Sequence, residues 1–241
     1  MRAETRHQLK QDRFSRVTID AAERTAHWTV EHKSKLIVAT VVVVVIAAAV
    51  TGGWYYLNQQ DQKASIELGQ AVRTLNTNLR PEGVPEEPGF PSFGSAKERA
   101  TAAHKQFQQI TDKYPHTHSS DIARYFLGLT SGDLGDNAAA ERELRTVASL
   151  SNDDLAGLAK FALASVYRNT NRNREAIDLY KKLIDKPAQT VGKVATQMEL
   201  AATYQTDNQP DEAKRIYQQV QKDNPNTEAA QLASTKLQDL K

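Results

Sequence analysis

The most pronounced feature of the hydrophobic pattern is an uncharged apolar run, LIVATVVVVVIAAAVTGGWYYL, from Leu36 to Leu57. A helix rises about 1.5 Å per residue, so this run is long enough to cross a hydrocarbon core of roughly 30 Å. The alternative is a cleaved signal peptide, because Ala47–Ala49 resembles a cleavage site. A preceding tail of 35 residues and the length of the run are untypical of such a peptide. The pattern therefore predicts an uncleaved transmembrane helix over residues 36–57.

The residues on either side of this run indicate its orientation. Residues 1–35 contain eight lysines and arginines and five acids, whereas residues 58–77 contain two basic residues. Cytoplasmic flanks of membrane helices are enriched in Lys and Arg, so the bias predicts a cytoplasmic basic tail over residues 1–35 and an exported C-terminal part. Aromatic side chains prefer the membrane–water interface, which makes Trp54, Tyr55 and Tyr56 the expected interface anchors.

Small residues recur four apart inside the membrane segment, pairing Ala48 with Gly52 and Ala49 with Gly53. Small side chains let two membrane helices approach closely. These four positions are therefore a candidate helix–helix contact, and a homo-oligomer formed through them is one hypothesis for the protein.

A second pattern recurs beyond residue 97, where an alanine is followed four residues later by a large apolar residue. Successive alanines are 37, 36 and 37 residues apart. A leucine followed by a small residue recurs upstream of the last three pairs. The alanine pairs are Ala103–Phe107, Ala140–Leu144, Ala176–Tyr180 and Ala213–Tyr217. The leucine pairs are Leu127–Gly128, Leu163–Ala164 and Leu200–Ala201. This arrangement predicts antiparallel helix pairs that stack, because one pair cannot bury its apolar face alone.

The domain organisation follows from these patterns and from the positions of proline. We expect a juxtamembrane helix over residues 58–79. Residues 80–96 are expected to form a Pro/Gly-rich loop, because they hold four of the chain's eight prolines. Residues 97–241 form the expected repeat domain, which ends in a capping helix with Thr227 as its N-cap. The predicted fold class is all-α, an N-terminal transmembrane helix followed by a helical-hairpin solenoid.

In stacked helix pairs of this kind, the first helices line a concave surface. The residue two positions before each repeat leucine is expected to point into that surface, and the residue two positions after the leucine is expected to lie beside it. The stripe is mostly apolar and predicts a groove that holds a short hydrophobic or helical segment of a partner protein. The alternative is that these side chains pack internally against residues 61–94. The expected groove residues are Tyr125, Leu129, Phe161, Ser165, Arg168, Met198, Ala202 and Gln205.

Composition narrows the chemistry further. The chain has no cysteine, which excludes disulfides, thiolate metal sites and a lipoprotein anchor, and its formal net charge of +2 does not suggest a nucleic-acid partner. His116 and His118 lie in an expected turn, where two imidazoles alone make a poor metal site. Asp153 and Asp154 follow Asn152 at a helix start, where capping explains them. We therefore expect a binding protein rather than an enzyme, with no cofactor, metal or catalytic residue.

The repeat phrases resemble the tetratricopeptide repeat, whose usual period of 34 residues is slightly shorter. The whole chain resembles the ancillary SecYEG translocon subunit (YfgM-like) family, which combines a short tail, one spanning helix and a tetratricopeptide-like domain. The segments that carry the resemblance are VEHKSKL before the span and GGWYYLNQQ at its exit. The resemblance implies a bacterial inner-membrane protein with a periplasmic C-terminal domain. Its implied partners are translocon subunits, periplasmic chaperones or exported chains.

Three alternative functions compete with this one, and the sequence disfavours one of them, the enzyme. A membrane-anchored repeat domain also fits a scaffold for envelope assembly or cell-division machinery. An enzyme with its site spread over the groove would need convergent titratable residues, whereas the expected stripe is apolar. Self-association through Gly52 and Gly53 would make the membrane helix itself the functional element.

Overall fold

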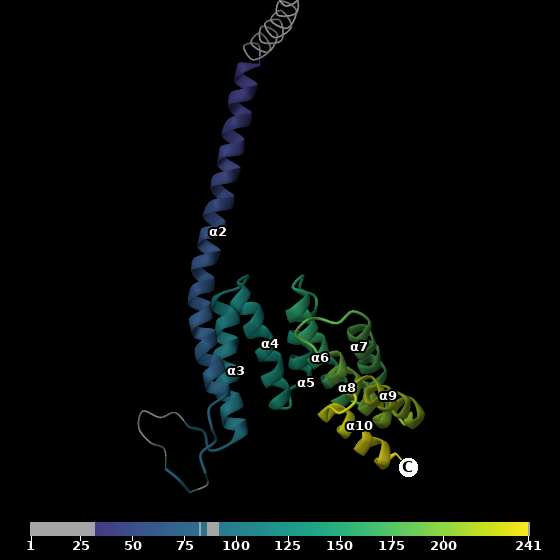
Figure 1. Ribbon diagram of the computed structural model, residues 1–241. Helices are drawn as coiled ribbons and strands as arrows, with labels where there is room; N and C mark the ends of the chain where they lie inside the picture. Colours follow the sequence, from purple (N-terminus) through teal and green to yellow (C-terminus); the bar gives the residue numbers. More distant parts are fainter. Residues whose placement is uncertain (1–31, 82, 86–91, 241) are drawn as a thin grey trace, which may run out of the picture. The chain divides into compact units, whose positions relative to one another are not determined.

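The computed structural model describes residues 32–81, 83–85 and 92–240, and this part of the chain is α-helical (Figure 1). Within those residues, the one β pairing is an isolated parallel bridge between Leu79 and Phe93. The predicted all-α fold class is therefore confirmed. The helices are α2 (Lys33–Leu75), α3 (Ala96–Lys113), α4 (His118–Asp133), α5 (Asn137–Ala148), α6 (Asp153–Asn169), α7 (Asn173–Asp185), α8 (Lys193–Thr206), α9 (Pro210–Asp223) and α10 (Glu228–Asp239).

The chain divides into two compact units, Met1–Tyr56 and Leu57–Lys241. The described residues of the first unit belong almost entirely to α2, and nearly all their side chains are exposed. The most apolar window of α2 has a mean hydropathy of 2.6 and none of it is buried, so by length and composition this helix can cross a membrane. A segment in lipid must pair its own backbone groups, which favours a helix even for the β-branched run Val41–Ile46.

α2 extends beyond the predicted span and the boundary expected after residue 57. It runs from Lys33 to Leu75 through Gly52 and Gly53, whereas the sequence pattern suggested a span over 36–57 and a separate helix over 58–79. No proline interrupts this stretch, so nothing forces the backbone out of the helix before Asn76. The loop consequently starts at Asn76 rather than at residue 80.

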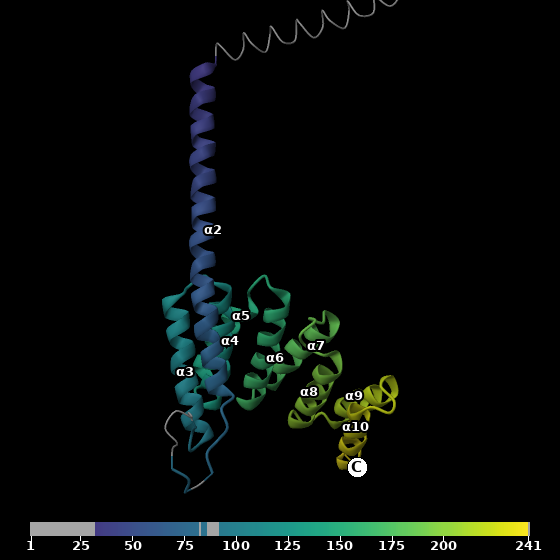
Figure 2. The ribbon, with the colours of Figure 1, turned by 60° about the vertical axis from the view of Figure 1, so that its left-hand side comes forward.

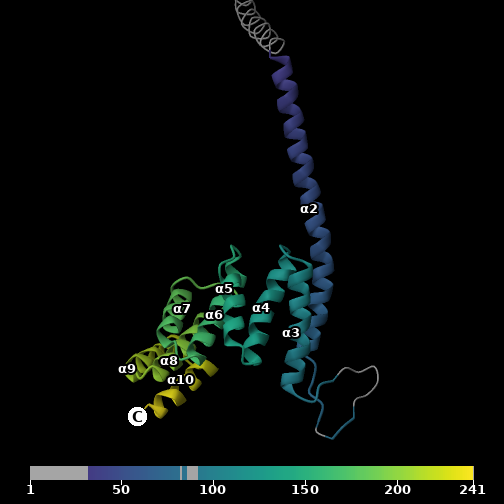
Figure 3. The ribbon, with the colours of Figure 1, turned by 180° about the vertical axis from the view of Figure 1, so that it is seen from behind.

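In the second unit, each helix packs against the next along the chain, in a row from α3 to α10 (Figure 2). The helices pair as α4 with α5, α6 with α7 and α8 with α9. α10 packs against α9 and α8 at the end of the row remote from α3, as expected of a capping helix (Figure 3). The result is a stack of helical hairpins in which each hairpin covers its neighbour.

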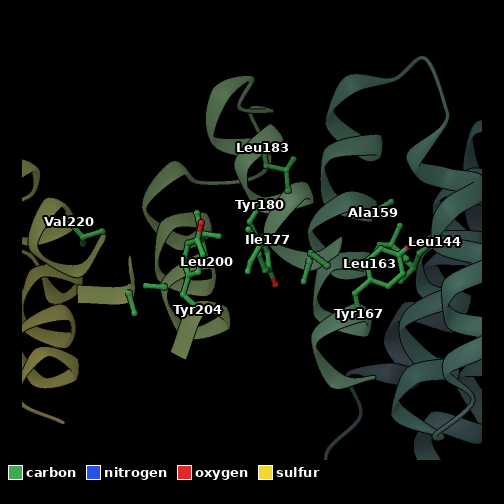
Figure 4. Packing of buried hydrophobic residues seen from close by; sticks show 14 of the residues in the cluster. Leu144, Ala159, Leu163, Tyr167, Ile177, Tyr180, Leu183, Leu200, Tyr204 and Val220 are labelled. Carbon is green, nitrogen blue, oxygen red and sulfur yellow. The ribbon is translucent and has the colours of Figure 1, made fainter. Parts of the chain in front are cut away.

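The recurring alanines and their partners four residues later form the centre of this stack. Ala103, Ala140, Ala176 and Ala213 have no exposed surface, and their large partners are at most 1 % exposed. Side chains from successive helices converge in one cluster that reaches from Leu144 to Ala233 (Figure 4). The small residue lets the helices approach, and the large residue fills the same face one turn later, because positions i and i+4 share a helix face.

In the turns between the helices, asparagines adopt the left-handed backbone conformation and polar side chains cap the helix N-termini. Asn171, Asn208 and Asn226 have positive φ values near 60°, a conformation that asparagine tolerates better than most residues. Asn152 accepts hydrogen bonds from the backbone of Asp154 and Leu155 at the start of α6, and Thr227 caps α10 in the same way. The expected N-cap Thr227 is therefore confirmed, and Asn152 is the N-cap of the helix that Asp153 and Asp154 begin.

The C-terminal part of α2 forms the first helix of the stack. Ala64 and Ala71 are fully buried in a second cluster with Phe107 of α3 and Leu127 of α4. The carboxylate of Asp61 accepts a hydrogen bond from the backbone N–H of Ser119 at 2.8 Å, at the start of α4. The helical array therefore begins inside α2, before the residue 97 that the sequence pattern suggested.

Glu67 adds a pH-sensitive contact to this first hairpin. Its Oε1 accepts hydrogen bonds from the Lys113 ammonium at 2.6 Å and from the Tyr114 hydroxyl at 2.7 Å. These bonds, with Lys113 contributing most, lower the pKa of Glu67 below its ordinary value. The stabilising contribution is thus present above the ordinary glutamate pKa and is lost as the pH falls through the lowered value.

We expect Glu67→Gln to lower the thermal unfolding midpoint of the full chain in detergent at neutral pH. The difference from wild type should shrink as the pH falls into the acid range, where Glu67 becomes protonated in the native protein as well. Unfolding midpoints measured across this range, with the exposed Glu228→Gln as a control, test the prediction. A constant difference at all pH values would contradict it.

Candidate partner-binding face

Eight side chains from the first helices of three hairpins share one register, and we call them the first-helix face. α4 supplies Tyr125 and Leu129, α6 supplies Phe161, Ser165 and Arg168, and α8 supplies Met198, Ala202 and Gln205. All eight are half-buried, neither fully covered nor freely exposed. The repeat thus places the predicted residues at equivalent positions of successive helices.

The large apolar members of the first-helix face rest on the hairpin core. The Phe161 ring meets the Tyr180 ring edge-on at 5.6 Å, and the Tyr125 ring meets Phe126 edge-on at 5.3 Å. Tyr125, Phe161 and Met198 all pack against the cluster that runs from Leu144 to Ala233. That cluster contains none of the described residues between 61 and 94, whose buried members Ala64 and Ala71 belong to the other cluster. The described loop and α2 residues thus do not belong to the core beneath Phe161 and Met198. Phe126, the ring partner of Tyr125, packs against the cluster that contains Ala64 and Ala71.

The polar members of the first-helix face are already engaged within the fold. Arg168 forms an ion pair with Glu199 of the next first helix, α8. Gln205 accepts a hydrogen bond from the Tyr217 hydroxyl at 2.9 Å. Glu199 was missed in the sequence analysis, because its partner lies 31 residues away and no local pattern joins them. Glu199 neutralises Arg168, so the pair adds no net charge to the face.

Tyr180 beneath this face carries a buried hydroxyl without a hydrogen-bond partner in the described part of the chain. The residue has no exposed surface. Burial raises the pKa of Tyr180 well above its ordinary value, and the Glu199 carboxylate adds to the effect. Tyr180 therefore stays neutral at physiological pH and acts as a core side chain.

In the apolar part of α2, the predicted contact positions are open surface. A side chain added at Gly52 or Gly53 would meet nothing within 4 Å. The interface anchors Trp54, Tyr55 and Tyr56 are each at least 60 % exposed. A helix–helix contact through Ala48, Ala49 and the two glycines stays a prediction.

No group of three or more His, Asp or Glu side chains that could hold a metal ion occurs among the described residues. His116 lies in a turn with a φ of 68°, and His118 is the exposed first residue of α4. Asp153 and Asp154 occupy the first turn of α6, and Asp154 also accepts a hydrogen bond from the backbone of Gln189. Helix capping and loop attachment account for these acids.

Comparison with protein-family models now connects this architecture to known proteins. A model described as a tetratricopeptide repeat-like domain matches residues 26–182, which is more than half of the chain. The chain belongs to the tetratricopeptide repeat-like domain family. A second model, described as a tetratricopeptide repeat, matches residues 195–227 of this tetratricopeptide protein. The first match includes α2, in agreement with its packing as the first helix of the stack.

Two solved structures show the same fold. Two crystal structures of nearly identical TPR-like repeats, from a kinesin light chain of Podosopora anserina, have a TM-score of 0.57 and 16 % identity. They cover 75 % of this chain, and the alignment spans 85 % and 86 % of theirs. A crystal structure of MamA has a TM-score of 0.44 and 19 % identity, over 65 % of this chain and 90 % of MamA. A search of curated proteins finds no match. The predicted tetratricopeptide repeat is confirmed, and such domains are protein-interaction scaffolds rather than typical enzymes.

Proposed function

We propose that this tetratricopeptide protein is a membrane-anchored scaffold that assists protein export, ancillary to the Sec translocon and to periplasmic chaperones. The apolar part of α2 holds it in the bacterial inner membrane, with the N-terminus in the cytoplasm and the repeat domain in the periplasm. Its partners are translocon subunits, chaperones or exported chains. The proposal is supported by the combination of one apolar helix with a repeat domain that belongs to a protein-binding family.

The first-helix face is the working surface in this proposal. Tyr125, Phe161 and Met198 recur at one position of the first helices of three successive hairpins, and each keeps part of its apolar surface exposed. The face carries no net charge, because Glu199 neutralises Arg168. An uncharged apolar stripe of this kind favours a hydrophobic segment of a partner and disfavours an isolated charge, which would lose its hydration there.

The membrane anchor strengthens such weak contacts. A domain tethered to the bilayer meets other membrane-bound proteins at a raised effective concentration, so modest affinity suffices. Emerging exported chains pass through the same layer beside the translocon. The membrane anchor therefore brings the repeat domain close to its partners, and the first-helix face determines which of them it binds.

In-cell photocrosslinking tests this function. We expect p-benzoylphenylalanine at Ser165, which lies between Phe161 and Arg168, to crosslink translocon subunits, periplasmic chaperones or exported chains. The same probe at Asp178, an exposed position of the second helix α7, is the matched control and should not capture them. Met198→Glu in the Ser165 probe strain should weaken the crosslinks, because a carboxylate then faces the apolar segment.

The identity of the captured proteins decides between the open functions. Capture of envelope-assembly or cell-division proteins, without translocon components, would replace the export role by the other scaffold role. Equal capture from Ser165 and Asp178 would contradict the assignment of the working surface.

A further inference from the structure

A cleft of about 380 Å³ lies between α7, α8 and α9, apart from the first-helix face. Its floor is formed by the buried side chains of Leu200 and Tyr204, and Ile184 and Ile216 line its sides. The remaining lining residues are polar or charged: Lys181, Asp185, Gln197, Arg215 and Gln219. The cleft thus combines an apolar interior with a charged rim.

The cleft and the first-helix face occupy opposite sides of α8. Successive helical residues turn by about 100°, so Leu200 and Tyr204 lie within about 40° of each other. Met198, Ala202 and Gln205 lie roughly 140–200° from Leu200 by the same count. A ligand in the cleft therefore contacts different side chains from a ligand on the first-helix face.

Comparison of two equivalent junctions within the stack shows what the cleft lacks. At the junction of α5 and α6, Arg145 lies over the Tyr167 ring at 5.7 Å and forms an ion pair with Glu141 at 2.7 Å. At the junction of α7 and α8, Lys181 lies over the Tyr204 ring at 5.6 Å. These residues correspond by the repeat, since Lys181 follows Arg145 by 36 residues and Tyr204 follows Tyr167 by 37.

The carboxylate of the first junction is missing from the second. The position of Glu141 is taken 36 residues later by Ile177, which is buried. Glu212 pairs with Arg215 at 2.7 Å, and no ion pair to Lys181 occurs in the described part of the chain. The hydrogen bond to Tyr204, together with the more distant charges of Asp178 and Glu212, raises the pKa of Lys181. Lys181 is exposed at the rim of the cleft, so an anionic group from outside can reach it.

We propose that this cleft binds a short extended segment of a partner protein in which an acidic residue stands next to an apolar one. The acidic side chain takes the place of the missing carboxylate at Lys181, and the apolar side chain enters between Ile184 and Ile216. The lining of the cleft extends along α8 from Gln197 to Tyr204, or about 10 Å at 1.5 Å per residue, which matches about three extended residues. The binding energy comes from burying the apolar side chain and from a charge-assisted hydrogen bond to Lys181.

Methyl NMR of the full chain in detergent micelles, with labelled isoleucines and methionines, tests this site. The probe is the tetrapeptide acetyl-Ser-Glu-Leu-Ser-amide, and its comparator carries Gln in place of Glu. We expect the Glu peptide to shift the Ile184 and Ile216 methyl signals and to leave the Met198 signal unchanged. The Gln peptide should bind about tenfold more weakly, because it lacks the charge that Lys181 pairs with.

Two variants make the test specific. Lys181→Gln should lower the affinity for the Glu peptide by about tenfold, to the affinity that the wild-type protein has for the Gln peptide. Lys182→Gln, the matched control, removes an exposed cation one residue further along α7 that lines a different cleft, and it should leave binding unchanged. Unchanged far-UV circular dichroism of both variants confirms folding.

Three outcomes would overturn the proposal. The first is equal binding of the Glu and Gln peptides, and the second is an equal loss in Lys181→Gln and Lys182→Gln. The third is tighter binding of acetyl-Ser-Ser-Leu with a free terminal carboxylate, which would assign the cleft to chain ends instead of internal segments. None of these outcomes depends on the Ser165 crosslinks, so the two sites are tested independently.

Discussion

Replacing Tyr180 with alanine is expected to destabilise the repeat domain more than any other single change considered for this protein. Tyr180 has no exposed surface and meets the Phe161 ring edge-on at 5.6 Å. Truncating a fully buried aromatic side chain removes its apolar burial and leaves a cavity, which together cost about 3–5 kcal/mol. Urea unfolding of the full chain in detergent, followed by circular dichroism, measures the loss.

The hydroxyl groups of Tyr180 and Tyr217 provide the matched control. The Tyr180 hydroxyl has no partner in the described part of the chain, so Tyr180→Phe should be neutral or slightly stabilising. The Tyr217 hydroxyl donates to Gln205 at 2.9 Å, so Tyr217→Phe should cost about 1 kcal/mol. A large loss in Tyr180→Phe would contradict the view that this side chain acts only through its ring.

The same change at Gly128 and Gly132 is expected to have opposite effects. A Cβ atom added at Gly128 would lie 2.7 Å from Cγ and 3.0 Å from Cδ2 of Leu144. Leu144 is fully buried and cannot move aside without displacing its neighbours. Overpacking of this kind costs about 1–3 kcal/mol, which exceeds the gain of up to about 1 kcal/mol from replacing a helical glycine by alanine. Gly128→Ala should therefore lower the free energy of unfolding.

Gly132→Ala tests the same helix without the clash. A Cβ atom there would lie 3.8 Å from Cβ of Ala140, an ordinary van der Waals distance. Only the improved helix propensity remains, so we expect a gain of up to about 1 kcal/mol. Urea unfolding of the two variants in parallel measures the change in the free energy of unfolding for each. Destabilisation by Gly132→Ala as well would contradict the prediction and show that α4 tolerates no added volume at either position.

The contrast between these glycines follows from the spacing of the repeat. Gly128 occupies the small position of the repeat phrase, facing Leu144 of α5, and Ala164 and Ala201 occupy it in the next hairpins. At this crossing Leu144 of α5 lies so close to Gly128 of α4 that no room is left for a Cβ atom. The glycine allows that approach in α4, and an alanine would force the helices apart.

The sequence alone determined the class of structure. The run from Leu36 to Leu57 carries no charge on any face, so by its length and composition it indicated a helix that can span a membrane, without reference to any other part of the chain. The recurring pairs such as Ala176 and Tyr180 indicated paired helices, because their spacing matches the helical period and their burial is repeated in each unit. The apolar run and the recurring pairs each depend only on residues close together in the sequence, so both could be recognised without the structure.

Only the tertiary structure decided how side chains meet across helices. Arg168 pairs with Glu199, and the helix that continues from the apolar segment becomes the first member of the stack through Ala64, which packs in one cluster with Phe107. These contacts join residues more than 30 positions apart, and they depend on the angle and the register at which two helices pack. Helical periodicity places a residue on a face, but it carries no information on which side chain of a neighbouring helix that residue will reach.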